Sequence, residues 1–450
     1  MRISLPAPGA VILGAAALSI GSILAQAQIT APLPSAPLTL DEAIQRAEAN
    51  EPALAAATAE SRATALERKD SRAALLPSAA YHNQYVFTQS NHTQASTTQG
   101  GVSQSLPVFI ANNAVHEYYS QGIVNETIGL AQLGAVKLAD ANAARAQAEL
   151  EIARRGLVST VIGLYYGVNS GSAKVRVAQQ ALDEANGFVN ITEKREAGRE
   201  AAHADVIKAR LSQQQRQREF DEARLASDRA RLELGVLLFP DPSTAYTLAS
   251  PDATPPLPER AEVEAVARAN NPELRSALAT LQAGQAETFN ARAALLPDLG
   301  LNFSYGVDAP ELAKRGPDGA RNLGYSASAT VDIPLWDWLT SERKVKEAHI
   351  RADAAKVNVT AAQRRLIADL SELYDEAEVA HRQLASFEAS VTDARESLRL
   401  TKLRYVNGES TVLDVVDAQN TAVSAENAQT DGIVRYYLAL GQLQTLTGKF

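Results

Sequence analysis

The chain has 450 residues, which is enough for two or three domains of ordinary size. Its formal net charge is −9 and no basic cluster stands out, so the composition argues against a nucleic-acid partner, because phosphate binding needs concentrated Lys and Arg. Cysteine is absent, which excludes disulfides, thiolate metal sites and cysteine catalysis. Aromatic residues make up only 5% of the chain, and this composition favours long helices over a thick mixed core.

The first 27 residues have the pattern of a secretory signal peptide. Arg2 supplies the positive start, residues 9–24 form a short apolar run, and residues 25–27 (AQA) match an A-x-A cleavage site. The alternative, a membrane anchor, is less favoured because the run is short and ends in a cleavage signal. No cysteine follows the cleavage site, so we expect an exported protein without a lipid anchor at that position.

The mature chain contains an internal repeat. Residues 47–52 (AEANEP) match residues 267–272 (ARANNP), and RAALLP occurs at both 72–77 and 292–297, at the same offset. The segment between the copies is rich in Pro, Ser and Asp and predicts a linker. We therefore expect a signal peptide at 1–27, a first repeat at 28–240, a linker at 241–258 and a second repeat at 259–450.

Both copies predict the same order of elements: a helix, a β-hairpin, a very long helix and a last helix. The first helices are expected at 39–76, where Thr39 and Glu42 form a capping box, and at 261–296. Proline ends each of them. The hairpins are expected at about 78–128 and about 298–334. The long helices are expected at about 130–197 and 336–407, each followed by a glycine at a turn, Gly198 and Gly408.

The first copy is longer by about 11 residues between Pro77 and Tyr165. The simplest place for the extra length is the hairpin connection at residues 89–113. An alternative aligns residues 106–109 (LPVF) with residues 333–336 (IPLW), and it requires two compensating length changes.

The long helix of the second copy carries a heptad pattern of apolar residues over about seven repeats. A second seam lies on the opposite side of the same helix, at about 100° per residue. A helix with two opposed seams has two neighbours, as the wall of a helical tube requires, whereas an ordinary two- or three-stranded coiled coil needs only one. The first seam begins Val345, Ala348, Ala352, Ala355, Val359, and the second comprises Ile350, Ala354, Val357, Ala361 and Ala368.

Three segments carry a family resemblance: the Ala-Leu-Leu-Pro before each hairpin, residues 334–338 (PLWDW) and residues 403–418 (LRYVNGESTVLDVVDA). With the duplicated layout, they resemble the TolC-type outer-membrane factors over nearly the whole mature chain. The resemblance implies a mainly α fold with a small β part. Long coiled-coil helices then form a trimeric α-barrel, and each protomer adds four strands to a twelve-strand transmembrane β-barrel.

The same resemblance implies a function without catalysis. The protein is expected to be the exit duct of a tripartite efflux or type I secretion system in the Gram-negative outer membrane, with most of the chain in the periplasm. Its implied partners are two further copies of itself, a periplasmic adaptor protein, an inner-membrane transporter and outer-membrane lipid. No cofactor and no metal is implied, and the sequence contains no zincin motif, Walker loop or G-x-G-x-x-G.

The resemblance also implies roles for residues near the helix tips. Asp414 and Asp417 match a carboxylate pair that lines the narrowest part of the tunnel, where three protomers would form a ring that attracts cations and raises the pKa of some members by repulsion. The alternative is a solvated acidic helix face. Tyr405 and Asp205 match an aromatic residue and a carboxylate that hold the tip closed. The chain departs from the family at Ser410, where an Arg is expected, and at Ala204, so candidates to substitute are Arg199, Glu200, His203 and Glu409.

Trp336 and Trp338 follow a predicted strand, and we expect either an aromatic belt at the membrane boundary or packing at a helix start. The main alternative function is a periplasmic coiled-coil scaffold or adaptor without a barrel. The hairpins distinguish the two, because a duct needs four strands of about 9 to 11 residues each.

Overall fold

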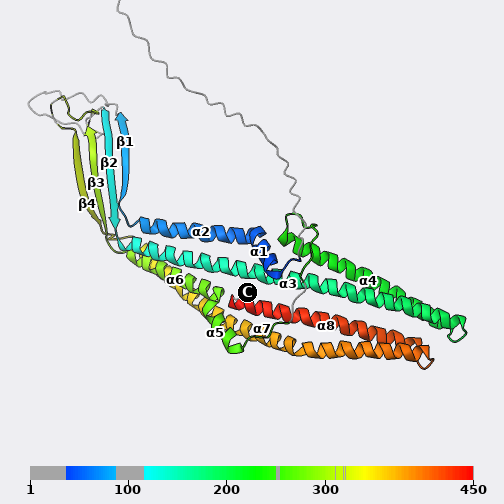
Figure 1. Ribbon diagram of the computed structural model, residues 1–450. Coiled ribbons are helices and arrows are strands. Elements are labelled where there is room, and N and C mark those ends of the chain that lie inside the picture. The colour runs from blue at the N-terminus through cyan, green and yellow to red at the C-terminus, as the bar shows by residue number, and fades with distance from the viewer. Residues whose placement is uncertain are drawn as a thin grey trace, which may run out of the picture.

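The computed structural model describes residues 37–87, 116–249, 254–309, 311–317, 319 and 321–448. The predicted signal peptide and the segment to which the extra length was assigned, including residues 106–109, lie outside the described residues. The molecule is elongated, with a sheet at one end and helices that run from the sheet to the opposite tip (Figure 1).

The two halves of the chain have the same order of elements. The first half comprises α1 (Leu40–Asn50), α2 (Pro52–Ala73), β1 (Ser78–Phe87), β2 (His116–Ile128), α3 (Leu130–Ala197) and α4 (His203–Leu238). The second comprises α5 (Arg260–Asn270), α6 (Pro272–Ala293), β3 (Asp298–Ala309), β4 (Leu323–Asp332), α7 (Thr340–Val406) and α8 (Val412–Thr447). The exact limits of the repeats and of the linker stay predictions.

Each predicted first helix is in fact two helices. Glu51 and Asn271, the residues before Pro52 and Pro272, have extended backbone, with ψ of 114° and 119°. A proline disfavours the helical conformation in the residue before it, which explains both breaks. Each proline then begins the next helix, where its missing N–H costs nothing. The predicted capping box of Thr39 and Glu42 is present.

The four strands form one antiparallel sheet in the order β1-β2-β3-β4. The hairpins β1–β2 and β3–β4 come from different halves, and β2 pairs with β3 from Tyr118↔Ala309 to Ile128↔Leu299. The sheet is therefore shared by the two halves, with β1 and β4 at its edges (Figure 1).

The long helices α3 and α7 extend along the molecule, and shorter helices lie against each of them. Helix α2 packs on the sheet end of α3 and α4 on its tip end, while α6 and α8 pack in the same way on α7 (Figure 1). With 68 residues, α3 is about 100 Å long at 1.5 Å per residue. Among the described helices, none is both long and apolar enough to cross a membrane.

The predicted first seam of α7 is buried in the structure. Its buried members include Ala348, Ala355, Val359, Leu366, Ala380, Val391, Ala394 and Leu398. The second seam is exposed in the single chain: Ile350 is 61% and Val357 67% exposed. Helix α7 begins at Thr340 rather than at Trp336, so the prediction of its start was wrong by four residues.

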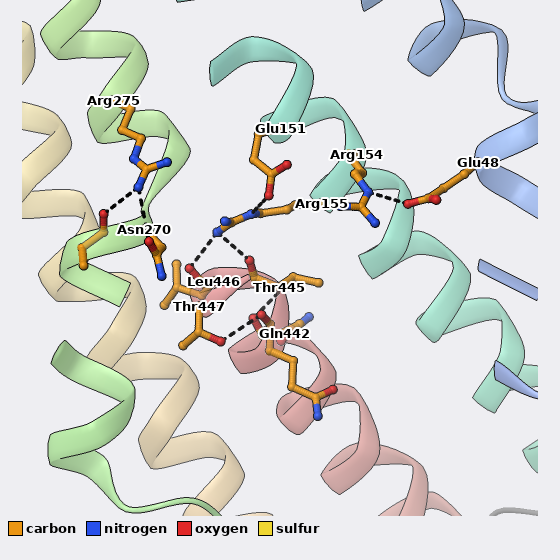
Figure 2. Close-up of polar contacts among 12 residues, drawn as sticks. Glu48, Glu151, Arg154, Arg155, Asn270, Arg275, Gln442, Thr445, Leu446 and Thr447 are labelled. Atoms are coloured by element: carbon orange, nitrogen blue, oxygen red, sulfur yellow. Dashed lines mark hydrogen bonds and ion pairs between the residues drawn. The ribbon is translucent and has the colours of Figure 1, made fainter. Parts of the chain in front are cut away.

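The C-terminal end of α8 is fixed to α3 at the middle of the molecule. Arg155 of α3 donates through Nη1 to the carbonyls of Thr445 and Leu446, both at 3.1 Å, while its Nε lies 2.7 Å from Glu151 (Figure 2). The neighbouring Arg154 pairs with Glu48 of α1 at 2.6 Å (Figure 2). Consecutive arginines of α3 thus hold one helix from each half, and the carbonyls at the end of α8 gain a positively charged cap.

Two helical glycines differ in the space around them. At Gly235 of α4, a Cβ would lie 2.5 Å from the carbonyl oxygen of Pro242, whereas at Gly187 of α3 nothing lies within 4 Å. We expect Gly235→Ala to lower the free energy of unfolding by about 1–3 kcal/mol, since backbone atoms would have to move. We expect Gly187→Ala to raise it by up to about 1 kcal/mol, since Ala favours helix over Gly. Chemical denaturation followed by far-UV circular dichroism measures the free energy of unfolding of both variants. Equal losses of stability in the two variants would contradict the close packing of Gly235 against Pro242.

Candidate functional site

The two faces of the sheet differ in chemistry. Because side chains alternate along a strand, the observed register brings every second residue of the four strands to one face. On one face, here called the apolar face, the polar residues are Asn83, His116, Ser120 and Glu126 among the described strand positions. Its large side chains are Tyr81, Tyr85, Phe87, Tyr118, Val124, Ile128, Leu299, Leu301, Phe303, Tyr305, Val307, Leu323, Tyr325 and Val331.

The opposite face, here called the polar face, carries amides, hydroxyls and carboxylates. Across it, Asn302 of β3 donates to Asn125 of β2 at 2.5 Å. Its polar members are Ser78, His82, Gln84, Glu117, Tyr119, Gln121, Asn125, Thr127, Asp298, Asn302, Ser304, Asp308, Ser326, Ser328, Thr330 and Asp332. Much of the apolar face is exposed in the single chain, including Tyr81, Phe303 and Tyr325. A sheet with one apolar and one polar face suits a boundary between lipid and water.

The segment between β4 and α7 carries the two predicted interface aromatics. Trp336 and Trp338 are exposed, with their ring centroids 5.9 Å apart in an edge-to-face arrangement. They lie just before the start of α7, and the choice between an aromatic belt and packing at the helix start stays a prediction.

The tip turns lie at the far end from the sheet, between α3 and α4 and between α7 and α8. Gly408 has the left-handed conformation, with φ of 78°, as its place after α7 predicts. Gly198 has φ of −74°, and the left-handed residue of the first turn is Arg199, with φ of 61°. The two turns therefore differ in which residue reverses the chain.

The predicted constriction carboxylates lie at the start of α8. Asp414 accepts hydrogen bonds from the backbone N–H of Thr411 at 2.7 Å, from the Thr411 hydroxyl at 2.8 Å and from the Ser410 hydroxyl at 3.1 Å. These bonds lower the pKa of Asp414 below its ordinary value. Within one protomer the carboxylate is thus stabilised in its charged form. Asp417 is exposed one turn further along the helix, and the constriction role of the pair stays a prediction.

Tyr405 lies at a junction of the two helix pairs. Its side chain is 4% exposed, contacts the Phe188 ring edge to face at 5.0 Å, and its hydroxyl donates to Thr192 at 3.3 Å. The Arg195 guanidinium lies 4.8 Å from the centre of the Tyr405 ring and also donates to the Tyr405 carbonyl. These contacts between α3 and α7 therefore join the tip end of the α3–α4 pair to the tip end of the α7–α8 pair, although the residues are far apart in sequence.

The predicted partner Asp205 lies elsewhere on the tip. Its nearest charged partner is Lys208, at 4.0 Å, and no hydrogen bond joins it to Tyr405 in the part of the chain that the structure describes. Of the candidates to substitute in the tip network, Glu200 lies 3.6 Å from Arg195 and His203 lies 2.7 Å from Glu196. The tip-closing role of Asp205 and Tyr405 stays a prediction.

Arg195 is the tip residue that sequence reasoning missed. A basic residue in the last turn of a helix is ordinary, because it complements the helix dipole. Its approach to Tyr405 depends on packing between α3 and α7, and no local sequence pattern predicts that contact. Within the described residues, no group of three His, Cys, Asp or Glu is placed to hold a metal ion.

The fold matches that of solved outer-membrane channels. The channel VceC of Vibrio cholerae superposes with a TM-score of 0.77 at 18% identity, over 91% of this chain and 96% of that one. Among curated relatives, outer membrane protein OprJ of Pseudomonas aeruginosa is 26% identical, over 68% of this chain and 63% of OprJ. The cobalt-zinc-cadmium resistance protein CzcC of Cupriavidus metallidurans is 25% identical, over 78% of this chain and 82% of CzcC.

The chain thus shares the fold of these solved channel proteins. Residues 265–449 match the family model described as outer membrane efflux protein. Over this segment the chain is similar to outer membrane efflux proteins. The fold expected from the resemblance, mainly α with a small antiparallel β part, is confirmed.

Arg195→Gln tests the contact between the tips. We expect faster amide hydrogen exchange in the turn after Tyr405, because the variant loses the charge over the ring and weakens the bond to the carbonyl. Arg199→Gln, a matched change in the same turn at a side chain with no ion pair among the described residues, is expected to leave that exchange unchanged. The measurement is amide hydrogen exchange followed by mass spectrometry. Equal protection of the turn after Tyr405 in the wild type and in Arg195→Gln would contradict the contact between Arg195 and Tyr405.

Proposed function

We propose that the protein is the outer-membrane exit duct of a tripartite efflux or type I secretion system, built from three copies of this chain. It conducts substrate passively from a periplasmic tunnel to the cell exterior. The observation that carries this proposal is the two-faced sheet, which continues directly into helices about 100 Å long. The match of residues 265–449 to the outer membrane efflux protein family supports it independently.

The sheet is incomplete in one chain. Strands β1 and β4 each have an edge without a partner among the described strands, and unpaired backbone groups are costly in lipid. The strands have 10 to 13 residues, enough to span an outer membrane when tilted. If β1 of one protomer pairs with β4 of the next, three protomers close a twelve-strand barrel with lipid outside and water inside.

The helices carry a matching set of exposed seams. On α7 the second seam is open, and on α4 the exposed Leu211, Leu225 and Leu232 recur at multiples of seven residues. Heptad spacing on the outside of a helix pair indicates a further helix as neighbour. In the proposed trimer, each of these seams would pack against α4 or α7 of an adjacent protomer, and the same packing would repeat around a closed tube.

The alternative of a periplasmic scaffold or adaptor without a barrel accounts for the helices but leaves the sheet without a role. In water, a sheet face with exposed Tyr81, Phe303 and Tyr325 is an aggregation hazard. A duct uses that face against lipid and the polar face as a lumen. The two-faced sheet therefore favours the duct.

The tip lies at the end opposite the sheet, so in this orientation it faces the inner membrane across the periplasm. An adaptor protein and an inner-membrane transporter are the partners that such an end would meet. Asp414 and Asp417, on one helix face at i and i+3, would form the ring of six carboxylates at the narrow end.

A decisive experiment combines fractionation with electrophysiology. We expect the full chain in the outer-membrane fraction as a heat-labile trimer, and the purified trimer to form ion-conducting channels in planar bilayers. A monomer in the periplasmic fraction would overturn the duct and favour the scaffold.

Val357→Glu tests the second seam. It introduces a charge where a neighbouring protomer is expected to cover a side chain that is 67% exposed in one chain. We expect the yield of heat-labile trimer to fall at least tenfold, since an uncompensated buried charge costs several kcal/mol. Leu312→Glu, at a similarly exposed leucine in the connection between β3 and β4, is the control and is expected to assemble normally. A normal trimer with Val357→Glu would show that the seam is not an interface.

The pair Asp414→Asn and Asp417→Asn tests the constriction. We expect the double variant to lose the inhibition of conductance by divalent cations, because the ring would no longer attract them. The pKa of Asp414 is lowered in the protein, so its charge persists as the pH falls toward the ordinary carboxyl value of about 3.9. Cation sensitivity in the wild type is therefore expected to persist as the pH falls through that ordinary value and to be lost only at lower pH. The matched control is Asp183→Asn on α3, and unchanged sensitivity in the double variant would refute the ring.

A further inference from the structure

Asparagine is followed directly by glycine at two places in the chain: Asn186–Gly187 in α3, and Asn407–Gly408 in the turn between α7 and α8. The two pairs have the same local chemistry, because glycine has no side chain to hinder its backbone nitrogen. Both pairs are exposed, so access of water does not distinguish them. The hydrogen bonds around them differ.

The pair in α3 is held in two ways. Gly187 lies well inside this helix of 68 residues, where its N–H belongs to the helical hydrogen-bond ladder. The side-chain carbonyl of Asn186 accepts a hydrogen bond from Nε2 of Gln213 in α4 at 2.7 Å. A reaction between Asn186 and Gly187 therefore requires the helix and its contact with α4 to open together.

The pair in the turn is held by less. Asn407 is the C-cap of α7, and Gly408 has the left-handed conformation. The Gly408 N–H donates to the Tyr405 carbonyl at 3.1 Å, at a helix end, where local opening costs little free energy. None of the hydrogen bonds among the described residues involves the Asn407 side chain. The amide and the glycine nitrogen are thus free to meet when the last turn of α7 opens.

We propose that Asn407 is a site of spontaneous deamidation in the folded protein, whereas Asn186 is protected. The Gly408 nitrogen loses its proton and attacks Cγ of Asn407. A bond from that nitrogen to Cγ forms, the bond from Cγ to Nδ2 breaks, and ammonia leaves with the proton. This inference does not depend on the proposed function.

Water then opens the five-membered imide at one of its two carbonyls. Opening at Cγ leaves an ordinary aspartate at position 407. Opening at the main-chain carbonyl leaves an isoaspartate, whose backbone is longer by one CH₂ group. Both products carry a carboxylate where the chain had a neutral amide, and the reaction consumes only water.

The new carboxylate lies beside two arginines of the tip. Arg404 precedes Asn407 by three residues, and Arg195 approaches the turn closely, since a Cβ built on Gly408 would lie 3.4 Å from its Nη2. Either product therefore adds a negative charge next to the guanidinium that contacts the Tyr405 ring. Deamidation thus changes the junction between the two helix pairs.

The test incubates the purified full-length protein at mildly alkaline pH. Trypsin cuts on both sides of each pair, so residues 177–194 and 405–435 give separate peptides, and mass spectrometry measures the replacement of NH₂ by OH in each. We expect the deamidated fraction at Asn407 to exceed that at Asn186 at least about tenfold, because a helix end opens far more easily than a helix interior. In concentrated urea, which unfolds both sites, we expect similar rates.

Equal deamidation at Asn407 and Asn186 in the folded protein would overturn the proposal. A difference that persists in urea would also overturn it, because it would arise from the neighbouring sequence rather than from the fold. Asn407→Gln is expected to abolish the signal at position 407, since the larger ring that a glutamine must form closes far more slowly. Any signal that remains there would place the reaction at another asparagine of the same peptide and overturn the assignment.

The incubated protein is also expected to have a looser turn. We expect faster amide exchange at residues 405–411 than in fresh protein, because isoaspartate moves the Gly408 N–H away from its acceptor. Asn407→Asp adds the charge without lengthening the backbone and is expected to loosen the turn less. Unchanged exchange in protein whose deamidation has been measured would refute the change at the junction.

Discussion

The antiparallel pairing of β2 with β3 joins the two halves of the chain, and the rest of the structure depends on it. Each half alone has a two-stranded hairpin, which is marginal in water. The pairing from Tyr118↔Ala309 to Ile128↔Leu299 creates a four-stranded sheet in which side chains of both halves share an apolar and a polar face. It also brings the starts of α3 and α7 to the same end of the molecule, so that both long helices leave the sheet in parallel (Figure 1).

These helices pack through small apolar residues that recur at regular intervals rather than through large side chains. Alanine makes up about half of the buried seam of α7, with Val and Leu between the alanines. Each alanine buries little area but allows close helix approach, as where Gly284 of α6 lies against Ala352. The stability of such a seam grows with its length, which explains why the helices are long. In the proposed trimer, the exposed second seam would pack against another copy of the chain in the same way.

Much of this architecture was predictable because it follows from periodic patterns. The heptad of α7, the prolines before each hairpin and the repeated order of elements indicated the helices and strands correctly. The breaks at Pro52 and Pro272 were missed although the signal was present, since a residue before proline rarely stays helical. The left-handed residue of the first tip turn was not predictable, because Arg199 has no intrinsic preference for that conformation. The contact of Arg195 with Tyr405 was not predictable either, because it joins residues 210 positions apart through the packing of two helix pairs.

The two halves have diverged where the chain leaves regular helix packing. At the sheet end, β2 enters α3 through one residue, whereas β4 reaches α7 through a strained segment with both tryptophans. At the tip, the first turn supplies Arg195 and the second supplies Tyr405 together with the capped Asp414. The long helices of the two halves have nearly the same length, 68 residues in α3 and 67 in α7. In the proposed duct, one end of the molecule would meet the membrane and the other the periplasm, and the differences between the halves lie at these two ends.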